Sequence, residues 1–302
     1  MRPVFYLNSD VQYTGAGDGS KDNPLQLMEP TQDFGDYLVK NPSAGLSTTV
    51  YGGMYRYSGN DQTSADGTIV GTDKVNNYVE LGDVLYRIIG VVSEDNETLG
   101  LEKGMVKVIK AETIGNQQWW IDNKTDIEWE RSLIYQRLND LDDDETNNVL
   151  SNINIIPSVF VNSIASVKWN VGDLKTETAT AESVLLSEKT NQTNEKSKIG
   201  LMYASDYYYA ADISGATNCS GNTLCLNWLT DIDNITWTMT RYGELSSDSY
   251  RLWRVFTDGS LSTHSMTNKR ALHPVFYLSK DVQYTIKGNG TKANPFQIRP
   301  SK

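Results

Sequence analysis

The residue types best suited to recognising a ligand gather between positions 241 and 270. This stretch, RYGELSSDSYRLWRVFTDGSLSTHSMTNKR, mixes arginines and aromatic residues with many serines and threonines. Rigid aromatic rings, guanidinium groups and adaptable hydroxyl groups are the composition of protein recognition surfaces. The sequence therefore predicts a ligand-binding surface made by Arg241, Tyr242, Tyr250, Arg251, Trp253 and His264.

A strand through residues 250–256 would present its side chains alternately on two faces. Leu252, Arg254 and Phe256 fall on one face, and Arg251, Trp253 and Val255 fall on the other. At least one arginine is therefore expected to be exposed beside an aromatic side chain. The alternative is that both arginines pair with carboxylates on a solvated face, because the chain carries a net charge of −11.

No combination of residues in the sequence predicts catalysis. A Ser-His-Asp, glycosidase or phosphate-loop arrangement is not found. Paired acids such as Asp231 and Asp233 carry little weight as a general acid and base in a chain with 38 acidic residues. We therefore expect a protein that is not an enzyme and that has no cofactor.

Metal binding is not expected either. The only two histidines, His264 and His273, do not stand at zinc-ligand spacing from the cysteines. The acidic run DDDE at 142–145 lacks the glycine and the distal glutamate of a helix-loop-helix calcium loop. We interpret this run as the solvated start of a helix.

The two cysteines, Cys219 and Cys225, stand in the sequence NCSGNTLC. Ser-Gly-Asn between them can turn the chain, so a short disulfide loop is predicted, as in many extracellular proteins. The alternative is a reduced pair in a cytoplasmic protein.

The charge balance limits the partners of this chain. A net charge of −11 disfavours nucleic acids and anionic membrane surfaces. The sequence has no run of eighteen apolar residues and no signal-peptide pattern. Membrane insertion within these residues is therefore not expected, and an export signal or anchor is expected outside them.

The two ends of the chain carry nearly the same sequence. Residues 3–27 and 274–298 match at 16 of 25 positions without a gap, with an offset of 271 residues. A repeat of this period predicts a slice of a tandem array. Residues 1–30 are then the C-terminal strand and turn of a preceding unit, 31–79 a linker, short helix and entering strand, and 80–302 the main domain. The alternative is a single protein with a duplicated terminal hairpin.

Local patterns predict the elements that must position these residues. Residues 84–92 and 105–113, VLYRIIGVV and MVKVIKAET, are the clearest strand pair and are expected at the centre of the domain. A short helix is expected after Thr31 or Asp33, two helices between 126 and 153, and one within 175–198. Gly17 and Gly19, which recur as Gly288 and Gly290, predict a turn with positive φ.

Several motifs follow one another in the last third of the chain: GLMYASDYYYA (200–210), WTMT (237–240), LWRVFTDGSLS (252–262) and HPVFYLSKDVQYTIKGNGTKANPFQI (273–298). In this order they resemble an uncharacterised family of bacterial surface domains, common in Firmicutes, whose units end in R-P-V-x-x-L and a G-D-G-T…N-P turn. His273 departs from the arginine of that pattern, which Arg2 keeps in the first copy. The tail also resembles the C-type-lectin-like fold of formylglycine-generating enzymes and of the variable proteins of diversity-generating retroelements.

The resemblance implies an α+β fold, a C-type-lectin-like mixed domain with a twisted antiparallel sheet, two or more helices and long loops. Most aromatic residues are then core, among them Tyr203, Trp228, Trp237 and Phe276. The implied function is a non-catalytic, extracellular adhesion or ligand-binding module of a cell-surface protein. Its partner would be a glycan or protein of a host or neighbouring cell, or neighbouring copies of the chain through the PVFYL segment. The alternative is a structural stalk or filament module.

Overall fold

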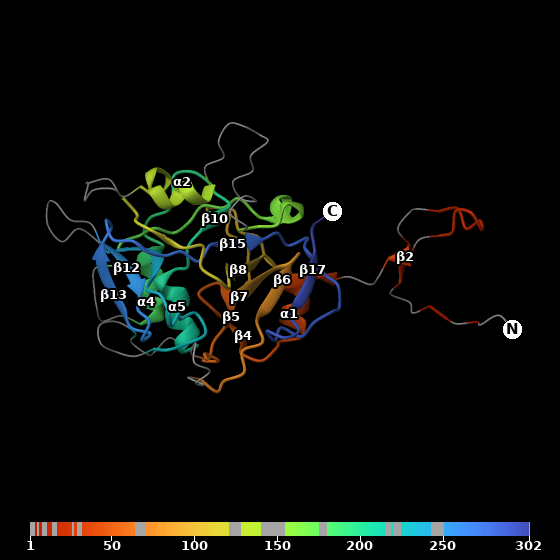
Figure 1. Ribbon diagram of the computed structural model, residues 1–302, viewed down its shortest axis with the longest axis horizontal. Helices are drawn as coiled ribbons and strands as arrows, with labels where there is room; N and C mark the ends of the chain where they lie inside the picture. The colour runs from red at the N-terminus through yellow and green to blue at the C-terminus, as the bar shows by residue number, and fades with distance from the viewer. Residues whose placement is uncertain are drawn as a thin grey trace.

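The computed structural model shows a mixed α+β domain in which strands outnumber helices (Figure 1). It describes residues 4, 6–7, 11–13, 17–25, 27–28, 32–63, 71–120, 128–139, 155–174, 180–214, 219, 225–242 and 251–301. The coarse fold class predicted from the sequence is therefore confirmed.

A large, mostly antiparallel sheet forms the centre of the domain. Its strands run in the order β10 (Ile199–Gly200), β15 (Val275–Leu278), β8 (Val106–Lys110), β7 (Val84–Val92), β6 (Tyr78–Leu81), β17 (Phe296–Arg299), β16 (Gln283–Tyr284) and β3 (Gln32–Asp33). β5 (Met54–Tyr57) also pairs with β7 and carries β4 (Leu46–Tyr51) at its outer side. The predicted pairing of β7 with β8 is confirmed, and both strands lie in the middle of the sheet, where nearly every residue in them is buried.

A second sheet lies at the other end of the domain (Figure 1). It contains β13 (Leu261–Ser265), β12 (Arg251–Val255), β11 (Thr236–Tyr242), β14 (Arg270–Ala271) and β9 (Asn116–Gln117), in that order. The predicted core residues Tyr203, Trp228, Trp237 and Phe276 are all buried, as expected.

Short helices cover the sheets. They are α1 (Phe34–Lys40), η1 (Trp129–Arg131), α2 (Leu133–Asn139), η2 (Ser158–Ser163), α4 (Ala181–Glu188) and α5 (Ala204–Ala211). α1 follows Asp33 as predicted, although the Asp33 side chain makes no capping hydrogen bond. α4 is the helix expected within 175–198, and it starts with a capping box between Thr180 and Ser183. Of the two helices predicted between 126 and 153, α2 is present, and the second lies outside the described residues.

A fully buried charge cluster joins α5 to the central sheet. The Asp206 carboxylate accepts hydrogen bonds from Arg56 Nη1 at 2.7 Å, Lys107 Nζ at 2.6 Å and the Tyr203 amide at 2.9 Å. The Lys107 ammonium also lies 3.8 Å from the centre of the Tyr203 ring. One carboxylate is therefore shared by two buried basic side chains, one from β5 and one from β8.

A second buried carboxyl group, that of Glu188, lies where α4, α5 and β11 meet. It accepts hydrogen bonds from the Ser205 amide at 3.1 Å, the Ser205 hydroxyl and the Thr240 hydroxyl at 2.5 Å. Burial raises the pKa of Glu188 to about 7, although the hydroxyl and amide donors work against this shift. Near neutral pH this carboxyl group is thus close to its titration midpoint.

Two further sequence predictions concern covalent structure and membranes. Cys219 and Cys225 form the predicted disulfide. Among the helices of the described residues, none has the length and apolar character needed to cross a lipid bilayer.

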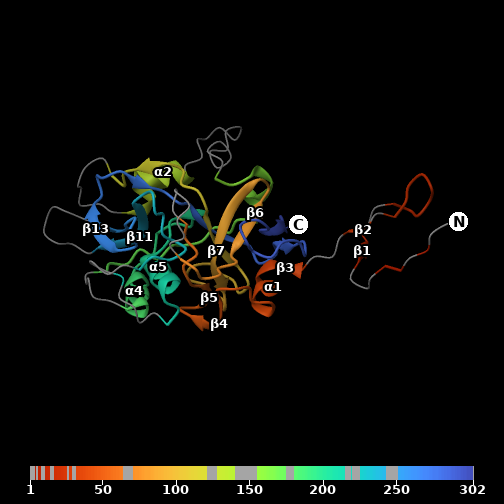
Figure 2. The ribbon, with the colours of Figure 1, turned by 60° about the horizontal axis from the view of Figure 1, so that its bottom comes forward.

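The terminal repeat is also a repeat in structure. β1 (Gln12–Tyr13) pairs with β2 (Leu27–Met28) in the register in which β16 pairs with β17, residue for residue at the offset of 271. The turns agree too, since the amides of Asp18 and Asn289 donate to the carbonyls of Asn23 and Asn294 at 3.0 and 2.9 Å. The β1–β2 hairpin stands apart from the rest of the molecule in both views, whereas β16–β17 is part of the central sheet (Figures 1 and 2).

The two hairpins offer a matched test of their glycines. Gly288 and Gly17 both have a φ of 86°, and a Cβ atom on either would lie within 2.0 Å of the carbonyl oxygen of Pro295 or Pro24. We expect Gly288→Ala to lower the free energy of unfolding by about 2 kcal/mol or more, because positive φ is strained and the turn must open. Gly17→Ala should leave it unchanged. Urea unfolding followed by tryptophan fluorescence measures both, since all seven tryptophans lie in the domain. Equal losses for the two variants would contradict this expectation.

Candidate functional site

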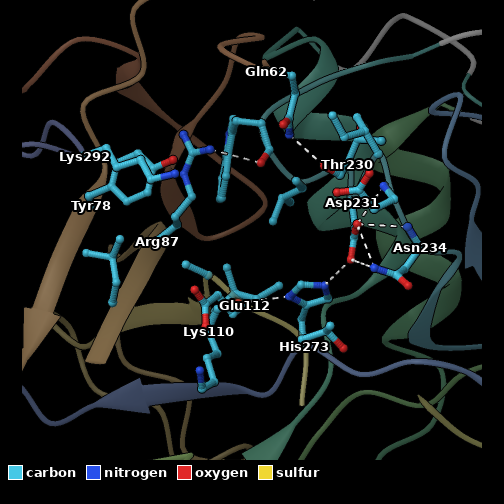
Figure 3. Close-up of a pocket in the computed structure, with 18 of the residues that line it drawn as sticks. Gln62, Tyr78, Arg87, Lys110, Glu112, Thr230, Asp231, Asn234, His273 and Lys292 are labelled. Atoms are coloured by element: carbon cyan, nitrogen blue, oxygen red, sulfur yellow. Dashed lines mark hydrogen bonds and ion pairs between the residues drawn. The ribbon is translucent and has the colours of Figure 1, made fainter. Parts of the chain in front are cut away.

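A polar cavity of about 540 Å³ opens between the ends of β6, β7 and β8 and the loop at 228–234 (Figure 3). This volume lies within the usual range of sites for small ligands. Its ionisable lining residues are of both kinds: Asp83, Glu112, Asp231 and Asp233 are acidic, and Arg87, Lys110, His273 and Lys292 are basic.

His273 and Asp231 form a hydrogen-bonded pair at this cavity. His273 Nε2 lies 3.0 Å from Asp231 Oδ2, and Nδ1 lies 3.1 Å from the carbonyl oxygen of Lys110. Burial raises the pKa of the Asp231 carboxyl, but hydrogen bonds from His273, the Asp233 amide and Asn234 outweigh it and hold that pKa below its usual value. Both ring nitrogens of His273 therefore face oxygen acceptors, so the ring ties the loop to β8.

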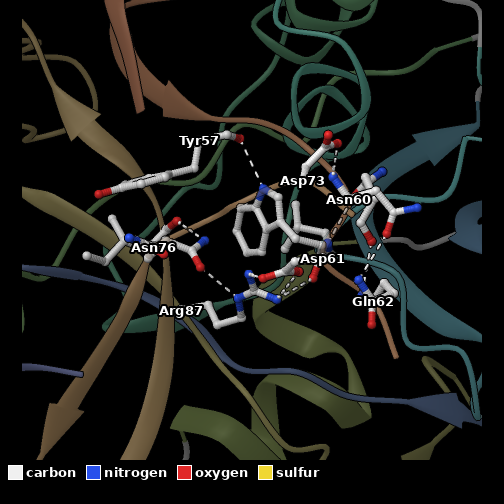
Figure 4. Close-up of polar contacts among 12 residues, drawn as sticks. Tyr57, Asn60, Asp61, Gln62, Asp73, Asn76 and Arg87 are labelled. Carbon is white, nitrogen blue, oxygen red and sulfur yellow. Dashed lines mark hydrogen bonds and ion pairs between the residues drawn. The ribbon is translucent and has the colours of Figure 1, made fainter. Parts of the chain in front are cut away.

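Arg87 on β7 forms another wall of the cavity (Figures 3 and 4). Its guanidinium group donates to both carboxylate oxygens of Asp61 at 3.1 and 2.7 Å, to Asn77 Oδ1 at 2.8 Å and to the Trp228 carbonyl at 3.2 Å. It also lies 4.4 Å from the centre of the Tyr78 ring and 4.8 Å from that of Trp228. This bidentate, stacked arginine is fully engaged and holds the wall in place.

Gln62 fixes the loop from the opposite side (Figures 3 and 4). Its side-chain amide donates to the carbonyls of Thr230 at 2.7 Å and Asn227 at 3.0 Å. The segment that carries Gln62 is held by Asn60, whose backbone amide donates to the Asp73 carboxylate at 2.7 Å. The loop is thus shaped before any ligand arrives.

Two other ionisable side chains at the cavity, those of Lys110 and Glu112, do not hold its walls together. Lys110 is only 8% exposed, and no described residue forms a hydrogen bond or ion pair with its ammonium group. Burial lowers the pKa of Lys110, and the nearby charge of Glu112 partly opposes this. Lys110 and the exposed carboxylate of Glu112 are therefore suited to bind polar groups of a ligand.

Those predicted ligand-binding residues that the structure describes lie instead on the second sheet. Trp253 is fully buried and donates its indole N–H to the Leu174 carbonyl at 3.3 Å, so its prediction as a contact residue is wrong. Arg241 is 8% exposed, with Nε 3.1 Å from an Asp173 carboxylate oxygen. Tyr250 lies outside the described residues.

Of the remaining predicted residues, Arg251 is exposed, and Tyr242 and His264 are half-buried. Arg251 stands opposite Tyr242 on β11 and Ser265 on β13. His264 Nδ1 lies 2.8 Å from the Asn268 side-chain amide. Burial lowers the pKa of His264, and the neighbouring arginines lower it further. One arginine beside an aromatic side chain is thus exposed, as the alternation predicted. The rest of β12 is buried on both faces.

The cavity itself was not predicted from the sequence. Its residues come from segments around positions 62, 87, 110, 231 and 273, which only the sheet topology brings together. Comparison of the chain with protein-family models, with curated proteins and with solved structures finds no match. We therefore infer the function from the geometry of this molecule.

Proposed function

We propose that this chain is a non-catalytic ligand-binding module of an extracellular bacterial repeat protein, with a C-type-lectin-like fold and its ligand in the polar cavity. The observation that carries the proposal is the cavity: Arg87, Gln62 and His273 hold its walls in place (Figure 3). Lys110 and Glu112 also line it, and neither side chain forms a hydrogen bond or ion pair among the described residues. Preformed walls with a few uncommitted polar groups are typical of binding sites. The disulfide agrees with an extracellular location.

The chemistry of the lining favours a saccharide. Sugar hydroxyl groups both donate and accept, so they suit a cavity that offers carboxylates and an ammonium group side by side. The half-buried ring of Tyr78 adds a flat apolar surface against which a sugar ring can pack. The acidic and basic residues are balanced in number, which favours a ligand without a large net charge.

The position of the connections also favours a displayed module over a stalk. The chain enters the domain at β3 and leaves it at β17. Both strands pair with β16 at one edge of the central sheet. The second sheet lies at the opposite end of the domain (Figure 1). A stalk gains length when its units are joined at opposite ends, whereas neighbouring connections present each domain to the side.

Binding to a glycan array should depend on the cavity. We expect Lys110→Met and Glu112→Gln each to weaken binding tenfold or more, because each removes a charge-assisted hydrogen bond worth about 1.5–3 kcal/mol. Arg251→Ala, at an exposed position of the second sheet, is the control and should bind like the unchanged protein. Circular dichroism would show that all three variants are folded.

The same experiment distinguishes the alternatives. Loss of binding in Arg251→Ala alone would move the site to the second sheet, as first predicted from the sequence. Absence of binding by the unchanged protein to every glycan would contradict the saccharide proposal. It would favour the structural stalk.

A further inference from the structure

The segment that completes the central sheet occurs a second time at the start of the chain. Most of the residues that are buried in the C-terminal copy have the same identities in the N-terminal copy. In the C-terminal copy, Val275, Phe276, Tyr277, Leu278, Val282 and Tyr284 are each at most 3% exposed. The residues at the corresponding positions, 4–7, 11 and 13, are identical. Every side chain by which β15 and β16 enter the core is therefore available in the N-terminal copy.

In the N-terminal copy, the described residues Val4, Tyr6 and Leu7 of this apolar surface are exposed. Val4 is 88% exposed, Tyr6 98% and Leu7 55%, whereas their counterparts on β15 lie between β10 and β8. Leu25 and Leu27, at the other end of the segment, are 54% and 49% exposed. The hairpin is already folded in the bound register, so little ordering would be needed for it to dock.

The N-terminal copy cannot take the place of the C-terminal copy in its own domain without disrupting the pairing of β3. Met28 corresponds to Arg299 at the end of β17, and the next strand of the chain, β3, begins at Gln32. β17 and β3 are both antiparallel to β16, which lies between them, so they run parallel to each other. A connection between parallel strands takes about a dozen residues, and only three are present here. Docking in the same molecule would thus require β3 to unpair.

We infer that residues 1–28 are a donor segment for a second copy of this domain. They occupy the place of residues 272–299 in a copy whose own closing segment is absent or displaced, by adding a central strand and a hairpin to its sheet. In a tandem array, that copy is the preceding unit. In the intact chain the site is filled by the C-terminal copy, which is linked to it and therefore has the higher effective concentration.

Two sequence differences set the expected strength of this contact. Phe296 packs against Phe34 and Tyr284, with ring centres 5.8 and 5.7 Å away, and its counterpart is the smaller Leu25. This exchange weakens the N-terminal copy as an occupant. Arg2 would replace His273, and an arginine can likewise donate to Asp231 and to the Lys110 carbonyl.

Peptide exchange on the whole folded chain tests the inference. A protease site placed in the turn at 267–269, between β13 and β14, is cut after folding, so that the closing segment is held only by its contacts. A fluorescently labelled peptide of residues 270–302 is first used to find the lowest urea concentration at which it replaces the closing segment of the cut protein. The labelled peptide of residues 1–28 is then added under the same conditions. The expected result is that a peptide of residues 1–28 also binds, more weakly than 270–302, with a rise in anisotropy.

Two controls make the outcome decisive. The peptide of residues 1–28 carrying Val4→Asp should lose its signal, because its counterpart Val275 is fully buried. The uncut chain should bind neither peptide. Failure of the 1–28 peptide to bind where 270–302 does, or equal binding by the Val4→Asp peptide, would overturn the inference.

Discussion

Replacing Asp206 by asparagine is expected to lower the free energy of unfolding by about 3–5 kcal/mol. The change keeps the shape of the side chain but leaves Arg56 and Lys107 without their shared counter-charge. Both cations are buried, so water cannot replace the carboxylate, and desolvation already lowers the pKa of Lys107. Urea unfolding followed by tryptophan fluorescence measures the loss.

An exposed ion pair supplies the control for this prediction. Asp36 pairs with Lys40 at 3.3 Å on α1, where the two side chains are 55% and 71% exposed. Asp36→Asn should change the free energy of unfolding by less than about 0.5 kcal/mol. If Asp206→Asn is as mild as Asp36→Asn, the buried cluster does not hold α5 to β5 and β8.

Stability should fall as the pH rises from about 4.5 to about 7, and Glu188 should be the cause. Its pKa is about 7 in the folded protein, against an ordinary value of 4.5. Between these values the folded state keeps a proton that the unfolded state has lost, so raising the pH favours unfolding. The difference corresponds to roughly 3 kcal/mol, reached above pH 7.

Glu188→Gln isolates this contribution from those of other titrating groups. Glutamine keeps the size and, like the protonated carboxyl group, one oxygen that only accepts and one group that donates, but it cannot ionise. Measured from pH 4.5 to 8, the unfolding free energy of the unchanged protein should decline relative to that of the variant. Parallel curves for the two proteins would show that Glu188 titrates normally.

Local patterns were enough to predict the parts of the fold that depend on neighbouring residues. The apolar runs at 84–92 and 105–113 gave the central strand pair, and the repeated glycines marked the terminal turn. The six-residue separation of Cys219 and Cys225 around Ser-Gly-Asn allowed their disulfide to be predicted. Each of these features is set by the backbone preferences of one short segment.

The candidate site could not be predicted in the same way. In the sequence, Asp231 resembles any other acid of an acidic chain, and only the fold brings His273 to it. Alternation along β12 failed for Trp253 because a strand covered on both faces buries both sets of side chains. Local sequence patterns do not predict that the segment around Leu174 packs against β12, where the Leu174 carbonyl accepts from the Trp253 indole.

The edge strands of the central sheet limit aggregation between neighbouring copies of this domain. β3 and β10, the two ends of the strand order, are two residues long, and β4, the outer strand beside β5, has an irregular register between Leu46 and Val50. Short or bulged edge strands expose few unpaired backbone groups to a neighbouring sheet. Identical domains held at high local concentration would thus have little opportunity to merge edge to edge.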